Sequence, residues 1–215
     1  MMKRDEMLKA LAGKITGDPI VVAAYSTAFD WIAIRPSPLN YISSGAMGMT
    51  SSHALGFALA WPDRKVILLD GDGSLLMNLG SLVTIAEAAP KNLVHCVAEN
   101  GVYEANGSHA IPGRNKVSFA GMAQNAGYRS THEFSDLAAF DQQIGDVLDG
   151  EGPVFVTLKC ERGETYPKDY GQNLPERSRI SDGPSRSRRW KPSRRHYPCL
   201  NCWEARPPPV AARFT

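Results

Sequence analysis

Two apolar runs, each followed by a polar residue next to glycine, constrain the fold of this chain more than any other feature. Residues 65–70 lead into Gly71-Asp72-Gly73, and residues 92–98 precede Asn100. Apolar runs of this length are typical of parallel strands that are buried on both faces of a sheet. Because the carboxyl ends of parallel strands meet at one edge, we expect Asp72 and Asn100 to share a ligand crevice.

The glycine-rich turn has the chemistry of a phosphate site. Residues 75–89 have a helical pattern, so the turn would present backbone N–H groups and the positive end of a helix to an anion. Asp72 adds a carboxylate oxygen, the kind of ligand that Mg²⁺ and Ca²⁺ prefer. The sequence therefore predicts a divalent ion, shared by Asp72 and Asn100, that ties a diphosphate to the protein. An ordinary tight turn with an unrelated asparagine is the simpler alternative.

The rest of the chain alternates between helix and strand patterns, which is the signature of a parallel α/β sheet. We expect a doubly wound, mostly parallel sheet with helices on both faces. Residues 100–117 are expected to form a long loop. Further helices are expected at residues 3–15, 26–34, 50–60, 119–126 and 135–148, and further strands at residues 19–24, 41–42, 128–130 and 153–159.

The composition changes sharply near residue 170. We expect a folded domain at residues 1–170 and a tail at residues 171–215. Residues 176–215 hold ten Arg and Lys against three Asp and Glu, a net charge of +7 that leaves the preceding residues at −5, because the whole chain carries +2. A tail rich in Pro, Arg and Ser predicts disorder. A basic tail could instead bind nucleic acid, but we do not expect this function.

The cysteines and the N-terminus bear on the compartment. Four cysteines are too few and too scattered for a disulfide framework. Cys199 and Cys202 could be half of a zinc site, but one such pair does not make a metal cage. The N-terminus is charged, and no apolar run is long enough to span a membrane. We expect a soluble cytoplasmic protein.

The glycine-rich motif resembles that of the thiamine-diphosphate (ThDP) enzymes. In their diphosphate-binding domain, Gly-Asp-Gly is followed by a spacer and an asparagine; here the spacer is the 26 residues 74–99. The family usually has a second asparagine where this chain has Gly101. The resemblance implies that the cofactors are ThDP and Mg²⁺, and that the metal is held by Asp72, Asn100 and the backbone carbonyl of Val102.

Residues 45–48, Gly-Ala-Met-Gly, match the same family. The resemblance implies that the Gly45 carbonyl accepts a hydrogen bond from the aminopyrimidine. It also implies that Met47 props the cofactor into its bent shape. A core methionine at the start of a helix is the alternative interpretation of Met47.

Other residues at the carboxyl ends of the strands are candidates for the diphosphate. Gly71, Gly73 and Ser74 belong to the turn, where Gly73 and Ser74 should offer backbone N–H groups and Ser74 a hydroxyl. Ser26 and Thr27 follow the first strand. They could contact phosphate, or simply cap the next helix.

The loop after Asn100 leads towards the substrate side. Glu104 and His109 are its ionisable candidates, and either could orient a carboxylate or shuttle a proton. A solvated loop is the alternative. We list them as candidate catalytic residues.

ThDP activation in the family requires a glutamate from a separate pyrimidine-binding domain, which we do not expect in this chain. A cofactor site divided between two chains is a feature of the sulfopyruvate and phosphonopyruvate decarboxylase family, which this chain resembles over residues 1–168. The resemblance implies a ThDP-dependent 2-oxoacid decarboxylase subunit, with a pyrimidine-domain partner chain, in a homo- or hetero-oligomer. It departs at Glu104 and Asn106, which replace smaller residues. A non-catalytic ThDP-binding module and an acetolactate-synthase-like carboligase are the alternatives.

Overall fold

The computed structural model of the protein describes residues 1–43 and 47–163. The predicted tail at residues 171–215, with Cys199 and Cys202, lies outside the described residues, as does Gly45. Among the described residues, no helix is both long enough and apolar enough to cross a membrane.

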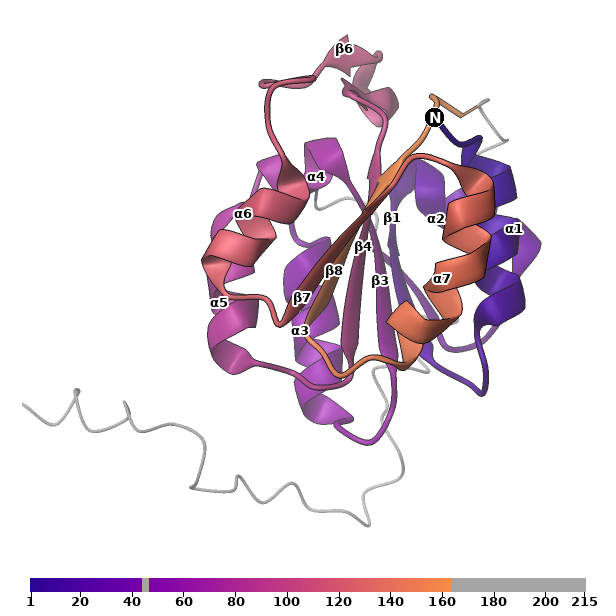
Figure 1. Ribbon diagram of the computed structural model, residues 1–215, viewed down its shortest axis with the longest axis vertical. Helices are drawn as coiled ribbons and strands as arrows, with labels where there is room; N and C mark the ends of the chain where they lie inside the picture. Colours follow the sequence, from indigo (N-terminus) through magenta and orange to yellow (C-terminus); the bar gives the residue numbers. More distant parts are fainter. Residues whose placement is uncertain (44–46, 164–215) are drawn as a thin grey trace, which may run out of the picture. The chain divides into compact units, whose positions relative to one another are not determined.

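A six-stranded sheet forms the centre of the body, with the strand order β2-β1-β3-β4-β8-β7. Every neighbouring pair in it is parallel. Strand β2 lies on one side of β1 and the other four strands lie on its other side, with helices on both faces, which confirms the predicted doubly wound sheet (Figure 1). The strands are β1 (Ile20–Ala24), β2 (Asn40–Ser43), β3 (Val66–Gly71), β4 (Leu93–Glu99), β7 (Ser130–Phe134) and β8 (Val154–Lys159).

Helices cover both faces of the sheet (Figure 1). One face carries α1 (Arg4–Lys14), α2 (Tyr25–Ile34) and α7 (Leu137–Asp149), and the other carries α3 (Thr50–Ala60), α4 (Asp72–Leu76), α5 (Gly80–Ala88) and α6 (Phe119–Ala126). Side chains alternate along each strand. Val21 therefore packs into the core under α1, α2 and α7, whereas its neighbour Val22 packs into the core under α3, α5 and α6.

The predicted single helix at residues 75–89 is wrong, because the structure divides it into α4 and α5. Near the break the backbone N–H groups donate to the carbonyl three residues earlier and not four, as in a 3₁₀ turn. These bonds run from Met77 N–H to the Ser74 carbonyl and from Asn78 N–H to the Leu75 carbonyl. Asn78 also donates its side-chain amide to the Gly48 carbonyl at 3.0 Å. Asn78 and Gly80 both have low helix propensity. The chain is therefore easily interrupted here, and the contact of Asn78 with Gly48 holds it at the break.

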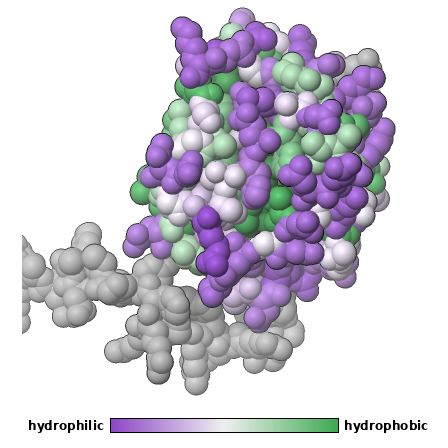
Figure 2. Space-filling view, in the orientation of Figure 1, coloured by the Kyte–Doolittle hydropathy of each residue, from purple (hydrophilic) through white to green (hydrophobic). Residues whose placement is uncertain are grey.

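The expected loop at residues 100–117 contains a small antiparallel hairpin. Its strands are β5 (Val102–Tyr103) and β6 (His109–Ala110), joined through the 3₁₀ turn η1 (Glu104–Asn106). The hairpin stands beyond the carboxyl edge of the sheet (Figure 1). Figure 2 shows that hydrophilic side chains gather at this end of the body.

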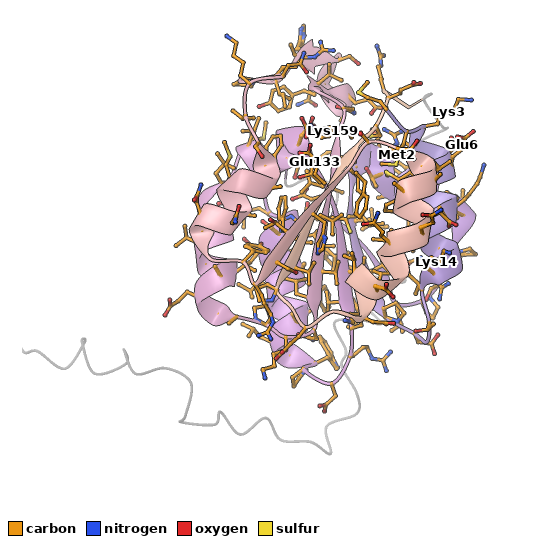
Figure 3. The ribbon with its side chains drawn as sticks, in the orientation of Figure 1. Met2, Lys3, Glu6, Lys14, Glu133 and Lys159 are labelled. Atoms are coloured by element: carbon orange, nitrogen blue, oxygen red, sulfur yellow. The ribbon has the colours of Figure 1, made fainter. Side chains whose placement is uncertain are left out.

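The N-terminus reaches the same edge. Met2 forms a parallel bridge with Cys160, just past the end of β8, and its N–H donates to the Lys159 carbonyl at 3.1 Å. Figure 3 shows Met2 and Lys159 at this edge. As a result, Arg4 begins α1 beside the carboxyl ends of the strands rather than at the far end of the body.

Candidate active site at the carboxyl edge

A cleft opens where the segments after β1, β3 and β4 meet the hairpin. Arg4 and Tyr103 also line it. The structure thus brings together ten of the sequence-predicted site residues: Ser26, Thr27, Met47, Gly71, Asp72, Gly73, Ser74, Asn100, Val102 and Glu104. His109 does not line the cleft; it is exposed on β6.

Asp72 lies at the bottom of this site and is 2% exposed. One carboxylate oxygen accepts the Gly73 N–H at 2.7 Å, and the other accepts the Gly101 N–H at 2.6 Å. Burial raises the pKa of Asp72 to about 6, although these backbone donors favour the charged form. Burial disfavours the charged form of a carboxylate, and a neighbouring cation would stabilise it.

Asn100 follows β4 and lines the same cleft as Asp72. Its side-chain oxygen accepts the Val102 N–H at 2.9 Å, and its amide nitrogen donates to Glu104 Oε2 at 2.9 Å. In residues 1–43 and 47–163 no group of three or more His, Cys, Asp or Glu side chains could hold a metal. A cation here would therefore be bound by one carboxylate with amide and carbonyl oxygens, a donor set that suits Mg²⁺.

The backbone conformation favours glycine at position 101. Its φ of +76° lies in the left-handed region, and a Cβ there would lie 2.8 Å from Nε of Arg114. Its N–H is also one of the two donors to Asp72. Asparagine, which the resembled family usually has at this position, also tolerates the left-handed region.

The glycine-rich turn is packed against the hairpin. A Cβ on Gly73 would lie 2.5 Å from ring atom Cδ1 of Tyr103, so the ring rests directly on the Gly73 backbone. The Ser74 hydroxyl accepts the Gly48 N–H at 3.2 Å, which ties the turn to the segment that carries Met47. Because α4 is only 5 residues long, the positive helix end at the turn is weaker than the predicted long helix would provide.

Ser26 and Thr27 lie inside the first turn of α2. The helix starts at Tyr25, its cap residue is Ala24, and no side chain caps it, so the predicted capping role is wrong. Tyr25 has a φ of +43°, a conformation that is uncommon outside glycine and that clusters at functional sites. Both hydroxyl residues line the cleft.

Arg4 is a site residue that the sequence reasoning missed. Its guanidinium contacts Asp30 Oδ2 through Nε at 2.5 Å and Glu104 Oε2 through Nη1 at 2.5 Å. The three side chains are 3%, 3% and 8% exposed. Burial raises the pKa of Asp30, although the adjacent Arg4 guanidinium opposes the shift. The signal was present in the sequence, since Arg4 begins the same helical stripe as Met7 and Leu11.

The chain matches a known protein family over more than half of its length. The family described as "Thiamine pyrophosphate enzyme, C-terminal TPP binding domain" matches residues 23–158, which run from β1 into β8. The chain belongs to this family. Its cofactor is thiamine diphosphate, and the matched range includes the residues that line the Asp72 cleft, apart from Arg4.

Individual relatives agree with this assignment. The chain is similar to the sulfopyruvate decarboxylase subunit beta of Methanothermobacter thermautotrophicus, with 33% identity over 163 residues, which cover 76% of this chain and 84% of that one. It is 40% identical over 124 residues to the phosphonopyruvate decarboxylase of Streptomyces viridochromogenes, covering 58% of this chain but 31% of that protein.

Solved structures of ThDP enzymes share the fold. A ThDP-dependent 4-hydroxybenzoylformate decarboxylase from Rhodococcus jostii superposes with a TM-score of 0.64 at 24% identity, covering 76% of this chain and 33% of that one. The chain therefore spans about a third of the length of that enzyme and of the phosphonopyruvate decarboxylase, and most of the length of the beta subunit.

Proposed function

We propose that this chain is the diphosphate-binding subunit of a ThDP- and Mg²⁺-dependent decarboxylase. Its substrate would be a small 2-oxoacid with a second acidic group, such as sulfopyruvate or phosphonopyruvate. The observation that carries the proposal is the position of Asp72, buried in a cleft between the turns after β3 and β4. The similarity across most of a sulfopyruvate decarboxylase beta subunit supports the substrate class.

In this proposal the metal is held by oxygen ligands from the loops after β3 and β4. Asp72 supplies a carboxylate, Asn100 an amide oxygen and Val102 its backbone carbonyl. The hydrogen bonds that fix Asp72 from Gly73 and Gly101 support this role, because they hold the carboxylate in one orientation.

Other residues of the cleft would hold the diphosphate and the rings. Gly73 and Ser74 would donate backbone N–H groups to the diphosphate, next to Gly71, Ser26 and Thr27. Met47, which lines the cleft, would prop the bent cofactor. Gly45, outside the described residues, would accept from its aminopyrimidine. When bound, the cofactor would supply a nucleophilic thiazolium carbon for the substrate ketone and a cationic ring that can accept the electron pair left by CO₂.

A partner chain would complete the site. We infer that it supplies the activating glutamate and covers the open side of the cleft near Met47, in a homo- or hetero-oligomer in the cytoplasm. Two observations support this inference. The relative that matches along most of its length is a beta subunit. The phosphonopyruvate decarboxylase relative has more than twice as much sequence outside the matched region as inside it.

Co-expression with a candidate pyrimidine-domain chain tests the proposal. The purified complex should release CO₂ from sulfopyruvate or phosphonopyruvate in the presence of ThDP and Mg²⁺, and the chain alone should not. Rapid CO₂ release by the chain alone would contradict the role of the partner. A stable complex that binds ThDP but releases no CO₂ from either substrate would instead favour a non-catalytic binding module.

A further inference from the structure

A buried ion cluster adjoins the proposed metal ligands, and we call it the Arg4 cluster: Arg4, Asp30, Glu104 and Asn100. Arg4 bridges the carboxylates of Asp30 and Glu104 at 2.5 Å each. Glu104 Oε2 also accepts the side-chain amide of Asn100 at 2.9 Å. The cluster therefore connects α1 and α2 with the turn after β4.

The fold delivers Arg4 to this position from far away in the sequence. Arg4 and Glu104 are 100 residues apart, and the bridge between Met2 and Cys160 fixes the start of α1 at the carboxyl edge. A Cβ on Gly163 would lie 2.1 Å from Nη2 of Arg4, so the chain after β8 packs directly against the guanidinium. The guanidinium is thus held on several sides.

We propose that Glu104, held in place by Arg4, is a positioning residue that fixes the side-chain amide of Asn100 for the metal. This inference rests on the proposed function, because it assumes that Asn100 is a metal ligand. An asparagine amide can turn over and exchange its oxygen and nitrogen. A carboxylate only accepts hydrogen bonds, so Glu104 selects the orientation in which the nitrogen faces Glu104 and the oxygen is left for Val102 N–H and a cation.

Arg4 is needed because a buried carboxylate without a counter-charge is strongly disfavoured. Without the guanidinium, the Glu104 side chain would turn out to solvent, and this change would remove its acceptor from Asn100. The geometry supports this positioning role, since the same oxygen, Glu104 Oε2, receives both Arg4 and Asn100.

Glu104→Met is the decisive variant. Methionine has a similar length but no strong acceptor, and its introduction leaves Arg4 paired with Asp30, so the fold should be retained. The Mn²⁺ affinity of the full chain, measured by electron paramagnetic resonance at saturating ThDP, should fall about 10- to 100-fold, as is typical when a group that orients a metal ligand is lost. Glu104→Gln, which keeps an acceptor oxygen, should recover most of this affinity.

Two further variants separate positioning from general stability. Arg4→Lys keeps the charge but cannot bridge both carboxylates as a planar fork does, so it should weaken Mn²⁺ in the same direction. Glu151→Met is the matched control, because Glu151 lies beyond the opposite edge of the sheet, in ion pairs with Lys91 and Arg129. It should leave the Mn²⁺ affinity unchanged.

The outcomes distinguish this inference from the proposed function. If folded Glu104→Met and Arg4→Lys proteins bind Mn²⁺ as tightly as the parent chain, the positioning role is overturned and the ThDP site stands. Equal affinities of Glu104→Gln and Glu104→Met would also overturn it, because the acceptor would then not matter. If the parent chain binds no Mn²⁺ in the presence of ThDP even in complex with its pyrimidine-domain partner, the proposed function is overturned as well.

Discussion

Adding one methyl group at Gly73 should loosen the contact between the glycine-rich turn and the hairpin. The new Cβ of Gly73→Ala would lie 2.5 Å from Cδ1 and 2.7 Å from Cε1 of Tyr103. Carbon atoms pack at about 3.5–4.0 Å, so the ring must move by about 1 Å. Overpacking of this kind costs about 1–3 kcal/mol, whereas alanine gains up to about 1 kcal/mol over glycine in a helix. We expect a net loss of about 1 kcal/mol.

Gly71→Ala provides a matched control in the same turn. A Cβ on Gly71 meets nothing within 4 Å, and its φ of −111° suits any residue. This variant should therefore be neutral or more stable by about 0.4–1 kcal/mol, because alanine restricts the unfolded chain. The two glycines, two positions apart, should give opposite signs in urea unfolding without cofactor.

A double-mutant cycle assigns the loss to the Tyr103 ring. In a Tyr103→Ala background the ring is gone and the nearest remaining atom, Cγ2 of Ile111, lies 3.5 Å from the Cβ position. Gly73→Ala should then cause no further loss of stability. If Gly73→Ala is as stable as Gly71→Ala in the parent background, or if its loss persists without the ring, this packing argument is refuted.

Two further predictions concern a helix cap and the hairpin. Ser118→Ala should lower the free energy of unfolding by about 0.5–2 kcal/mol, because Ser118 caps α6 by accepting the Gly121 N–H at 3.0 Å. Equal urea midpoints for the variant and the parent chain would contradict this prediction. His109→Gln should change the ThDP affinity by no more than about twofold, as is usual for an exposed side chain outside a site; calorimetry that shows a larger loss would place His109 over the bound cofactor.

The sequence predicted the parallel sheet correctly, because the pattern within each strand and the alternation of strands and helices indicated the same fold. The apolar runs at β3 and β4 are buried on both sides, and that pattern is incompatible with a solvent-facing strand. The same runs placed Asp72 and Asn100 at one edge, since parallel strands leave no other arrangement.

The parts that were missed depend on contacts between distant segments. The break between α4 and α5 combines the low helix propensity of Asn78 and Gly80 with the hydrogen bond of Asn78 to Gly48, and no local pattern reveals that contact. The β5–β6 hairpin has strands of two residues each, too short for a periodic signal. Arg4 stood in the apolar stripe of α1, but only the structure shows the Glu104 that it meets.

ThDP binding by the full chain and by Asp72→Asn tests the central claim most directly. Titration calorimetry with Mg²⁺ present should show binding by the parent chain and a loss of more than about 100-fold in the variant, since even groups that only orient a ligand contribute 10- to 100-fold. The control is Asp146→Asn, an equal change at an exposed position on α7, which should bind as the parent does. Equal ThDP affinities of Asp72→Asn and the parent chain would contradict the account.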